Sequence, residues 1–441
     1  MRTYSSAGVD KYITGGFLSV ILAGTLLLLG SFAAYDVVIP PLDALFLSAS
    51  AVCVTGFSPV EDIAALPIPS QIILLLLVQV GGIGIMGGAS ILALVTRQRL
   101  GLRQRLFIAT ELGVDSPMNV LGVLKLVFAY TVSFEAAGAC LLYMKFASMG
   151  LSPGMALYHA VFHAVSAFCS GGFSLYPDSL DRFSGTFILP ATVMALMVVG
   201  GLGFPVLNEL RDRRLGRLKF LSPYARIVLT STAALTLTGA VLYTIFEWNA
   251  AFAGMSPLVK VWNGLFTSLS ARGGGFHTVD YPTWSAEGLM TTIFFMFIGG
   301  APFSTAGGLK ITTFAVLLLA AVSEIRQEED VVAFGRKIPY STVRRALAIA
   351  FIYILTLFVA TVAMSKLETL PFYSLVFDAI SALGTSGLSS GITPKLSGPG
   401  KIVVVLLMFW GRVGILTFSY SLIRRERMEN VRFPETNIPL G

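Results

Sequence analysis

The sequence is poor in charged residues, which occupy only 12% of its 441 positions, whereas hydrophobic residues occupy 55%. Soluble globular proteins carry about 25% charged residues. A soluble chain of this length would also be expected to divide into about two or three domains. The shortage of charge therefore excludes an ordinary soluble protein. It predicts one continuous helical bundle with membrane lipid as its solvent.

Cysteine and histidine are also scarce, with three residues of each. Cys53, Cys140 and Cys169 stand far apart in apolar sequence without CxxC or metal-ligand spacing, so we expect neither a disulfide framework nor a zinc site. His159 and His163 lie four residues apart, but without a nearby acidic ligand they predict a packed helix and not a metal pair. Because no polar catalytic constellation lies within the apolar segments, the chain is not predicted to be an enzyme.

The net charge of +7 is not accompanied by a soluble basic domain with interleaved aromatic residues, so no nucleic-acid partner is predicted. The first apolar run has no small-residue cleavage site after it and is interpreted as a spanning helix, not a signal peptide. Lys and Arg gather instead in connectors at 96–105, 211–226, 324–345 and 424–432. By the positive-inside rule, these connectors and both termini are predicted to lie on the cytoplasmic side of the cell (plasma) inner membrane.

Eight apolar segments approach or exceed the about 20 residues that cross a bilayer. They are 13–34, 69–95, 121–147, 187–207, 227–246, 289–322, 346–364 and 402–423. The less basic connectors each begin with a helical stretch of about a dozen residues, too short to span, and then become rich in glycine. This pattern predicts re-entrant pore loops, because non-helical backbone at membrane depth must be buried in protein or line a watery cavity.

The four glycine-rich loops align with one another. Residues 51–58, 167–174, 270–277 and 382–389 read AVCVTGFS, AFCSGGFS, SARGGGFH and ALGTSGLS, with one glycine common to all. The predicted fold class is an all-α integral membrane protein of four tandem helix–pore-loop–helix units around a pseudo-fourfold central pore. The predicted units are 1–105, 106–220, 221–335 with an intramembrane gating loop at 299–310, and 336–441 with the C-terminal tail.

Such loops suit the chemistry of a potassium ion, which must lose its water to pass a narrow filter. Carbonyl groups from four loops can replace the hydration shell, and glycine adopts the required backbone angles without steric cost. The C-terminal ends of the short helices would add a favourable dipole. The predicted ion-binding residues are Val54, Thr55, Gly56 and Phe57; Ser170, Gly171, Gly172 and Phe173; Gly273, Gly274, Gly275 and Phe276; and Thr385, Ser386, Gly387 and Leu388.

The sixth apolar segment is too long for one span, and it alone has a strong interruption of glycine, proline and small polar residues, which break helices. A flexible segment beneath the filter would obstruct the ion path; the alternative is a proline kink with tight helix packing. Arg412, in the last segment, would be costly at membrane depth without partners. Carbonyls and hydroxyls of the interruption are the expected partners, and an ion pair elsewhere in the bundle is the alternative. The predicted gate residues are Gly299, Gly300, Ala301, Pro302, Phe303, Ser304, Thr305, Ala306, Gly307, Gly308, Lys310 and Arg412.

Two further groups of residues keep two interpretations each. Gly84, Gly88, Gly200, Gly201 and Gly203 are candidates for hinges or for close helix packing, of which packing is the commoner use. The acidic residues of the less basic connectors could concentrate cations at a pore mouth or be solvated loop residues. They are Glu61, Asp62, Asp178, Asp181 and Asp280.

The motifs at 54–57, 170–173, 273–276 and 385–388 resemble those of the Trk/Ktr/HKT superfamily of potassium transporters, and within it the Ktr-type membrane subunit, over essentially the whole chain. The resemblance implies potassium uptake, with sodium dependence left open, by a homodimer. It also implies a cytosolic regulatory ring (KtrA-like) that binds ATP or ADP and moves the gating loop, which Arg412 latches. In the family, glycine at all four filter positions accompanies potassium preference, and here Gly273 and Gly274 replace the usual Thr-Ala-like pair. The alternative function is a broken-helix secondary transporter of another solute.

Overall fold

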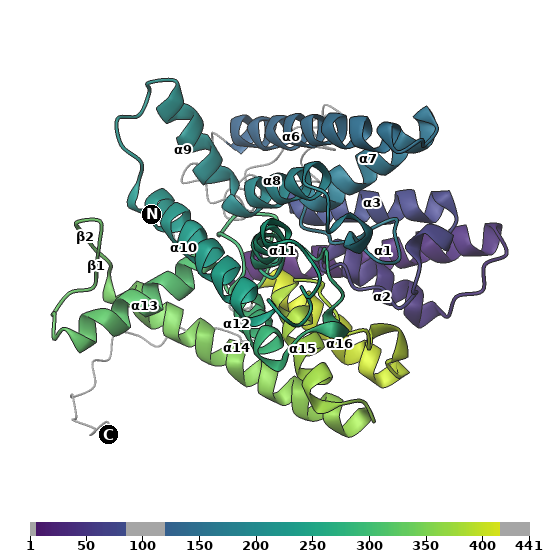
Figure 1. The fold of residues 1–441 in the computed structure, drawn as a ribbon. Coiled ribbons are helices and arrows are strands. Elements are labelled where there is room, and N and C mark those ends of the chain that lie inside the picture. Colours follow the sequence, from purple (N-terminus) through teal and green to yellow (C-terminus); the bar gives the residue numbers. More distant parts are fainter. Residues whose placement is uncertain (1–5, 85–119, 415–441) are drawn as a thin grey trace.

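The computed structural model describes residues 6–84 and 120–414, and these residues are mostly helical (Figure 1). Four helices within these ranges are long and apolar enough to cross a membrane. Much of their surface is apolar and exposed; Leu26 and Phe351 are 70% and 69% exposed, as expected of side chains that face lipid. These helices are α1 (Ser6–Ala34), α6 (Val120–Ser148), α10 (Pro223–Phe246) and α14 (Tyr340–Leu367).

Each long helix is followed by a short, largely buried helix of 12 to 16 residues that ends at a predicted pore loop. Three of them begin with a proline, whose fixed φ suits the first helical turn and whose missing N–H costs nothing there, and in α15 the proline is the N-cap residue Pro371. At about 1.5 Å per residue these helices are shorter than a bilayer core of about 30 Å. They are α2 (Pro41–Val52), α7 (Pro153–Phe168), α11 (Pro257–Ser270) and α15 (Phe372–Gly384).

A third helix follows each pore loop, after a single turn of 3-10 helix. These turns are η1 (Ile63–Ala65), η3 (Asp181–Phe183), η4 (Tyr281–Thr283) and η5 (Thr393–Lys395). The third helices are α3 (Ile68–Ile83), α8 (Ile188–Leu202), α12 (Ala286–Phe297) and α16 (Gly398–Val413). The element order of long helix, short helix, loop and third helix therefore occurs four times.

The third helices are interrupted in more than one place, which corrects the sequence analysis. Only the segment 289–322 was predicted to be broken, and it does divide into α12 and α13 (Ile311–Ile325). The predicted span 187–207 is also broken: α8 meets α9 (Phe204–Arg214) at an angle of 98°. The bend lies at Gly203, whose φ of 84° is easy only for glycine.

The helices α3 and α16 end at glycines with the same backbone conformation. Gly84 and Gly414 have φ values of 90° and 93° with ψ of 142° and 135°. Two predicted spans, 69–95 and 402–423, extend beyond these glycines and so lie partly outside the described residues. Gly88 lies wholly outside them. Three of the four third helices thus stop or bend at a glycine, and the fourth gives way to the 299–310 loop.

The third helix of each set packs against the short helix of the next. Thus α3 contacts α7, α8 contacts α11, and α12 contacts α15. The last contact closes the series, because α16 packs against α2, and Figure 1 shows this C-terminal helix (yellow) beside the N-terminal helices (purple). The four sets of helices therefore form one closed ring, in which each third helix lies beside the short helix of the next set.

A small β-hairpin interrupts the helical pattern after α13. It pairs β1 (Val332–Ala333) with β2 (Arg336–Lys337) in antiparallel register, through a turn in which Phe334 and Gly335 both have positive φ. This is the pattern of a tight hairpin turn. The hairpin lies within the basic connector 324–345.

Candidate functional site

The four predicted pore loops share one unusual backbone conformation. In each loop the first residue has a positive φ: 56° at Val54, 61° at Ser170, 111° at Gly273 and 49° at Thr385. The common glycine two positions later also has a positive φ, of 95°, 68°, 72° and 78° in loops one to four. A left-handed conformation is uncommon for residues other than glycine and is held only by surrounding structure. Because the four loops share this uncommon conformation at equivalent positions, we infer that they have the same function.

The loops also meet in the order one, two, three, four, one. A Cβ placed on Gly56 would lie 2.6 Å from the Gly171 carbonyl oxygen, and one placed on Gly172 would lie 2.7 Å from the Gly275 Cα. A Cβ placed on Gly275 of loop three would lie 3.1 Å from the Ser386 carbonyl oxygen of loop four. A Cβ on Gly387 would overlap the Thr55 carbonyl and so closes the ring. The four loops that contain the sixteen predicted ion-binding residues are therefore brought together in a closed ring.

A serine near the end of each short helix supports the loop behind it, and the sequence analysis did not single these serines out. Each serine carbonyl accepts a hydrogen bond from the N–H of the second loop residue, at 2.6 to 2.9 Å. Three of the hydroxyls also bind the loop backbone: the Gly56 N–H donates to one, and the Phe173 and Phe276 carbonyls accept from the others. The fourth bonds the Ser386 hydroxyl. The serines are Ser50, Ser166, Ser270 and Ser381, and their recurrence before each glycine motif was the missed signal.

The last residue of each loop is a large apolar side chain that is almost completely buried. Phe57, Phe173, Phe276 and Leu388 are each at most 1% exposed. Their burial anchors the loop ends among the surrounding helices.

On one side of the ring, the four common glycines line a cavity of about 290 Å³. Glu61, Asp178, Asp181 and Asp280 also line this acidic cavity, whereas Asp62 does not and instead accepts a hydrogen bond from the Ala64 N–H. Four carboxylates around the entrance give it a negative potential that attracts cations. Of the two interpretations of these residues, the geometry favours the concentration of cations.

The carboxylates of the acidic cavity differ in their environment. Burial, and then the neighbouring charges of Asp178 and Asp280, raise the pKa of Asp181. Burial also acts on Asp178, but hydrogen bonds and an ion pair of 2.7 Å from Arg182 outweigh it, so the pKa of Asp178 is lowered. Asp181 is therefore the first of this pair to lose its charge as the pH falls.

On the opposite side of the ring lies the predicted gating loop, 299–310. Its Ala301 and Thr305 N–H groups donate to the Gly201 and Gly200 carbonyls of α8, at 3.0 and 3.2 Å. The Thr305 hydroxyl bonds both the Phe168 carbonyl and the Ser170 hydroxyl of loop two. One side of the gating loop is thus attached to α8 and to the base of loop two.

The other side of the gating loop reaches loop four. A Cβ on Gly307 would overlap the Thr385 side chain, and one on Gly308 would lie 2.9 Å from the Gly384 carbonyl oxygen. Lys310 donates to the Ala306 carbonyl at 2.9 Å and so closes the loop on itself. The loop therefore lies across the base of the ring, from loop two to loop four.

Arg412 joins this arrangement from α16. Its guanidinium donates hydrogen bonds to the Thr305 carbonyl of the gating loop and to the Gly81 carbonyl of α3. Backbone carbonyls carry partial negative charge, which favours an arginine at this depth. A single side chain thus connects α3, α16 and the gating loop.

The glycines of α8 divide between the two uses that the sequence left open. A Cβ on Gly200 would overlap the Phe168 carbonyl, so this position requires close packing. Gly203 instead provides the bend between α8 and α9.

The histidine pair behaves as a packed pair. The His163 Nδ1 contacts the His159 carbonyl at 2.8 Å, its Nε2 contacts the Ser174 hydroxyl at 3.1 Å, and its ring lies against Phe146. Across residues 6–84 and 120–414, no group of three or more His, Cys, Asp or Glu side chains is arranged to hold a metal ion. The three cysteines are free thiols.

Comparisons with known proteins agree over nearly the whole chain. A family model for TrkH, described as a cation transport protein, matches residues 12–432. The Ktr system potassium uptake protein B of Bacillus subtilis is 33% identical over 430 residues, which cover 97% of this chain and 95% of the relative. The potassium/sodium uptake protein NtpJ of Enterococcus hirae is 33% identical over 441 residues, with 98% and 97% coverage. The fold is similar to the crystal structure of the potassium transporter TrkH from Vibrio parahaemolyticus, with a TM-score of 0.76, 20% identity, and coverage of 96% and 86%.

Proposed function

Because the chain belongs to the TrkH family of cation transport proteins, we propose that it takes up potassium ions through a filter formed by its four glycine-centred loops. It is a multi-pass membrane transporter and not an enzyme. One observation carries the proposal: four loops with the same pair of left-handed positions meet in a closed ring. We propose that backbone carbonyls of this ring face its centre, where they can replace the water of a desolvated cation.

Potassium is the proposed main substrate, and sodium is proposed as a secondary or coupling ion. All four loops carry the common glycine, so no side chain of these four residues competes with the backbone carbonyls there. Relatives of the chain are named for potassium uptake and for potassium/sodium uptake. The acidic cavity above the ring would raise the local cation concentration without distinguishing between the two ions.

The loop 299–310 is proposed to be the gate. It lies across the base of the ring, and its hydrogen bonds to α8 and to Arg412 connect it to helices on both sides. Opening requires the loop to move away from Thr385 and Ser170, so a signal that shifts α13 or α16 could open the path. Lys310 and Arg412 add positive charge at this level, which would hinder cations while the loop is in place.

A partner and a location complete the proposal. Relatives are named as parts of a Ktr system, which supports an assembly with further components. The proposed assembly is a homodimer of this chain that binds a cytosolic nucleotide-binding ring sensing ATP or ADP. The four units 1–105, 106–220, 221–335 and 336–441 remain a proposed division, since the boundary at 105/106 lies outside the described residues. The basic connectors support cytoplasmic termini in the plasma membrane.

The proposal is tested by cation flux into liposomes that contain the purified protein. Gly56→Ser should lower the ratio of potassium to sodium uptake, because a Cβ there would press on the Gly171 carbonyl. Gly150→Ser is the matched control: its φ is also positive, at 86°, but no atom lies within 4 Å of a Cβ there. Unchanged selectivity in Gly56→Ser would contradict the filter assignment.

Deletion of residues 303–307 should raise potassium flux in the same assay, because this removes the segment beneath the ring. A parent protein and a deletion variant that both fail to conduct any cation would reject the pore. That result would favour a secondary transporter of another solute, the alternative that broken helices such as α8–α9 support.

A further inference from the structure

Loop three differs from the other loops in the residue that precedes it. Arg272 stands immediately before Gly273, whereas the equivalent positions in loops one, two and four are Cys53, Cys169 and Gly384. Arg272 is only 9% exposed, and within the described ranges no ion pair includes it. A buried arginine at membrane depth is costly and therefore calls for a functional explanation.

Loop three is also the loop with the least support from its own side chains. Its first three residues are all glycine, which has the greatest conformational freedom to lose on folding. Loop two is held by the Ser170 hydroxyl, which bonds Thr305, and loop four by the Ser386 hydroxyl, which bonds Ser381. Loop three has no equivalent hydroxyl, so its geometry depends on neighbouring residues.

Arg272 supplies a connection from loop three to the long helix α10. One terminal nitrogen of its guanidinium donates to the Thr236 hydroxyl of α10, and its Nε donates to the Ser268 carbonyl at 3.3 Å. The Ser268 hydroxyl in turn donates to the Thr236 carbonyl at 2.9 Å. The two bonds to Thr236 attach the end of α11, and with it the first residue of loop three, to α10, and the bond to the Ser268 carbonyl holds the guanidinium against the end of α11.

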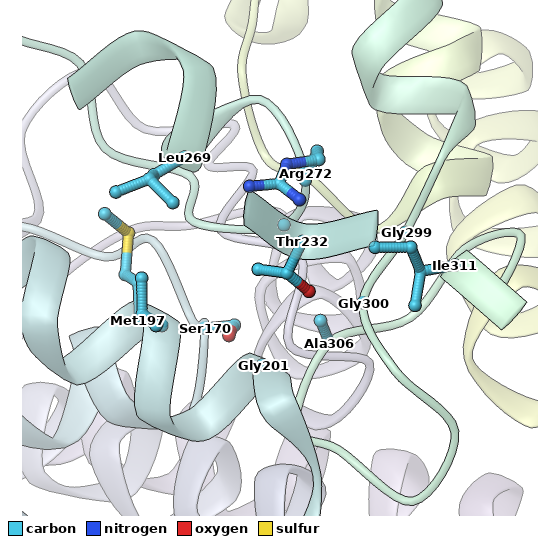
Figure 2. Close-up of a pocket in the computed structure, with 12 residues that line it drawn as sticks. Ser170, Met197, Gly201, Thr232, Leu269, Arg272, Gly299, Gly300, Ala306 and Ile311 are labelled. Atoms are coloured by element: carbon cyan, nitrogen blue, oxygen red, sulfur yellow. The ribbon is translucent and has the colours of Figure 1, made fainter. Parts of the chain in front are cut away.

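The other face of Arg272 borders a cavity of about 40 Å³, shown in Figure 2. Gly273 of loop three, Gly299 and Gly300 of the gating loop, and Thr232 of α10 line the same cavity. About 10–15 Å³ is enough to hold one water molecule, so this cavity has room for water. Beside the cavity, Gly273 packs against Ala306 of the gating loop and Gly274 against Met197 of α8. The hydrogen bond of Arg272 to Thr236 adds a connection to α10, on whose side the cavity leaves room for loop three to shift.

We propose that Arg272 is a positioning residue that fixes the backbone of loop three and thereby sets the selectivity for potassium over sodium. The inference rests on the proposed function of the four loops as a filter. The planar guanidinium reaches two acceptors at once, which a lysine ammonium on a flexible stem cannot do with the same geometry.

The test compares Arg272→Gln, Arg272→Lys and Thr236→Val in liposomes, with initial potassium and sodium uptake measured per reconstituted protein. Arg272→Gln and Thr236→Val should each lower the potassium-to-sodium ratio about tenfold, equivalent to about 1.4 kcal/mol, while sodium uptake persists. Arg272→Lys should restore part of the ratio. Thr230→Val is the matched control, because Thr230 is an exposed threonine of α10 whose hydroxyl bonds only its own helix.

Two outcomes would overturn the inference. The first is a parental ratio in folded Arg272→Gln. The second is a parental ratio in Thr236→Val, which keeps the charge and removes the hydroxyl that accepts from Arg272, together with that hydroxyl's own bond to the Thr232 carbonyl. The control Thr230→Val loses a bond of the latter kind alone. Thr236→Val also decides the matter if Arg272→Gln fails to fold. Gly56→Ser is measured in parallel. If Gly56→Ser changes the potassium-to-sodium ratio and the Arg272 and Thr236 variants do not, only the inference about Arg272 fails. If Gly56→Ser leaves the ratio unchanged, the filter assignment fails.

Discussion

Gly275→Ala is the substitution whose effect on ion selectivity the geometry defines best. Gly275 is the common glycine of loop three, with a φ of 72°. An added Cβ would lie 2.5 Å from the Gly172 Cα of loop two, whereas ordinary contacts of this kind begin at 3.4 Å and almost none fall below 3.0 Å. Loops two and three must therefore separate by at least 3.0 − 2.5 = 0.5 Å, and by 3.4 − 2.5 = 0.9 Å to reach ordinary contact.

This separation is large for a binding site. Functional constellations must be held within about 0.5 Å of their productive geometry. If one ion–carbonyl contact is lost, and is worth as much as a hydrogen bond to a charged group, the cost to bound potassium is about 1.5–3 kcal/mol. That cost corresponds to a loss of roughly 10- to 150-fold in potassium preference.

The assay is the ratio of potassium to sodium uptake in liposomes, with Gly391→Ala as the control. Gly391 also has a positive φ, of 84°, but the nearest atom to its added Cβ would be 3.9 Å away, so the control carries the same backbone strain without the clash. Both variants should lose about 1–2 kcal/mol of stability from that strain. Equal ratios in the two folded variants would refute the conclusion that contact between loops two and three determines selectivity.

Two further substitutions test the surroundings of the ring. Asp378→Asn should lower the free energy of unfolding in detergent by about 1–3 kcal/mol. The buried carboxylate accepts hydrogen bonds from Ser389, Ser390 and Thr393, and an amide can accept only part of them. An unchanged melting temperature would contradict this. Asp181→Asn should reduce potassium uptake at low ionic strength and remove its decline under mild acid, because the raised pKa of Asp181 makes its charge the earlier one to disappear as pH falls; a parental pH profile would reject it.

The sequence alone predicts the parts of this molecule that depend on local pattern. The common glycine, its place between a short helix and a spanning one, and the long helices α1, α6, α10 and α14 all follow from hydropathy and glycine content. Local pattern does not distinguish Gly200, which permits close packing, from Gly203, which bends the helix, because the difference lies in what stands opposite each residue. The erroneous prediction of a single interruption has the same cause.

Long-range contacts are the second class of feature that the sequence could not supply. The contact of α16 with α2 joins the two ends of the described chain, and no local signal marks it. In the sequence, Arg272 does not differ from other basic residues, and only the folded arrangement of α11 and α10 shows its contact with Thr236. The repeated serines were visible before each loop, but only the hydrogen bonds to the loop backbone give them a function.

The two faces of the ring are held by different kinds of contact. On the face of the acidic cavity, the buried carboxylate Glu247 accepts from the Ser285 N–H and hydroxyl at the start of α12, and Glu368 does the same for Ser397 and α16. Charge-assisted bonds to a helix start are strong and leave little freedom. The gating loop is held instead by single, mostly neutral bonds to carbonyls, with Arg412 as its charged contact. Because the weaker contacts yield first, a displacement of α13 or α16 should move the gating loop before it disturbs the four glycines.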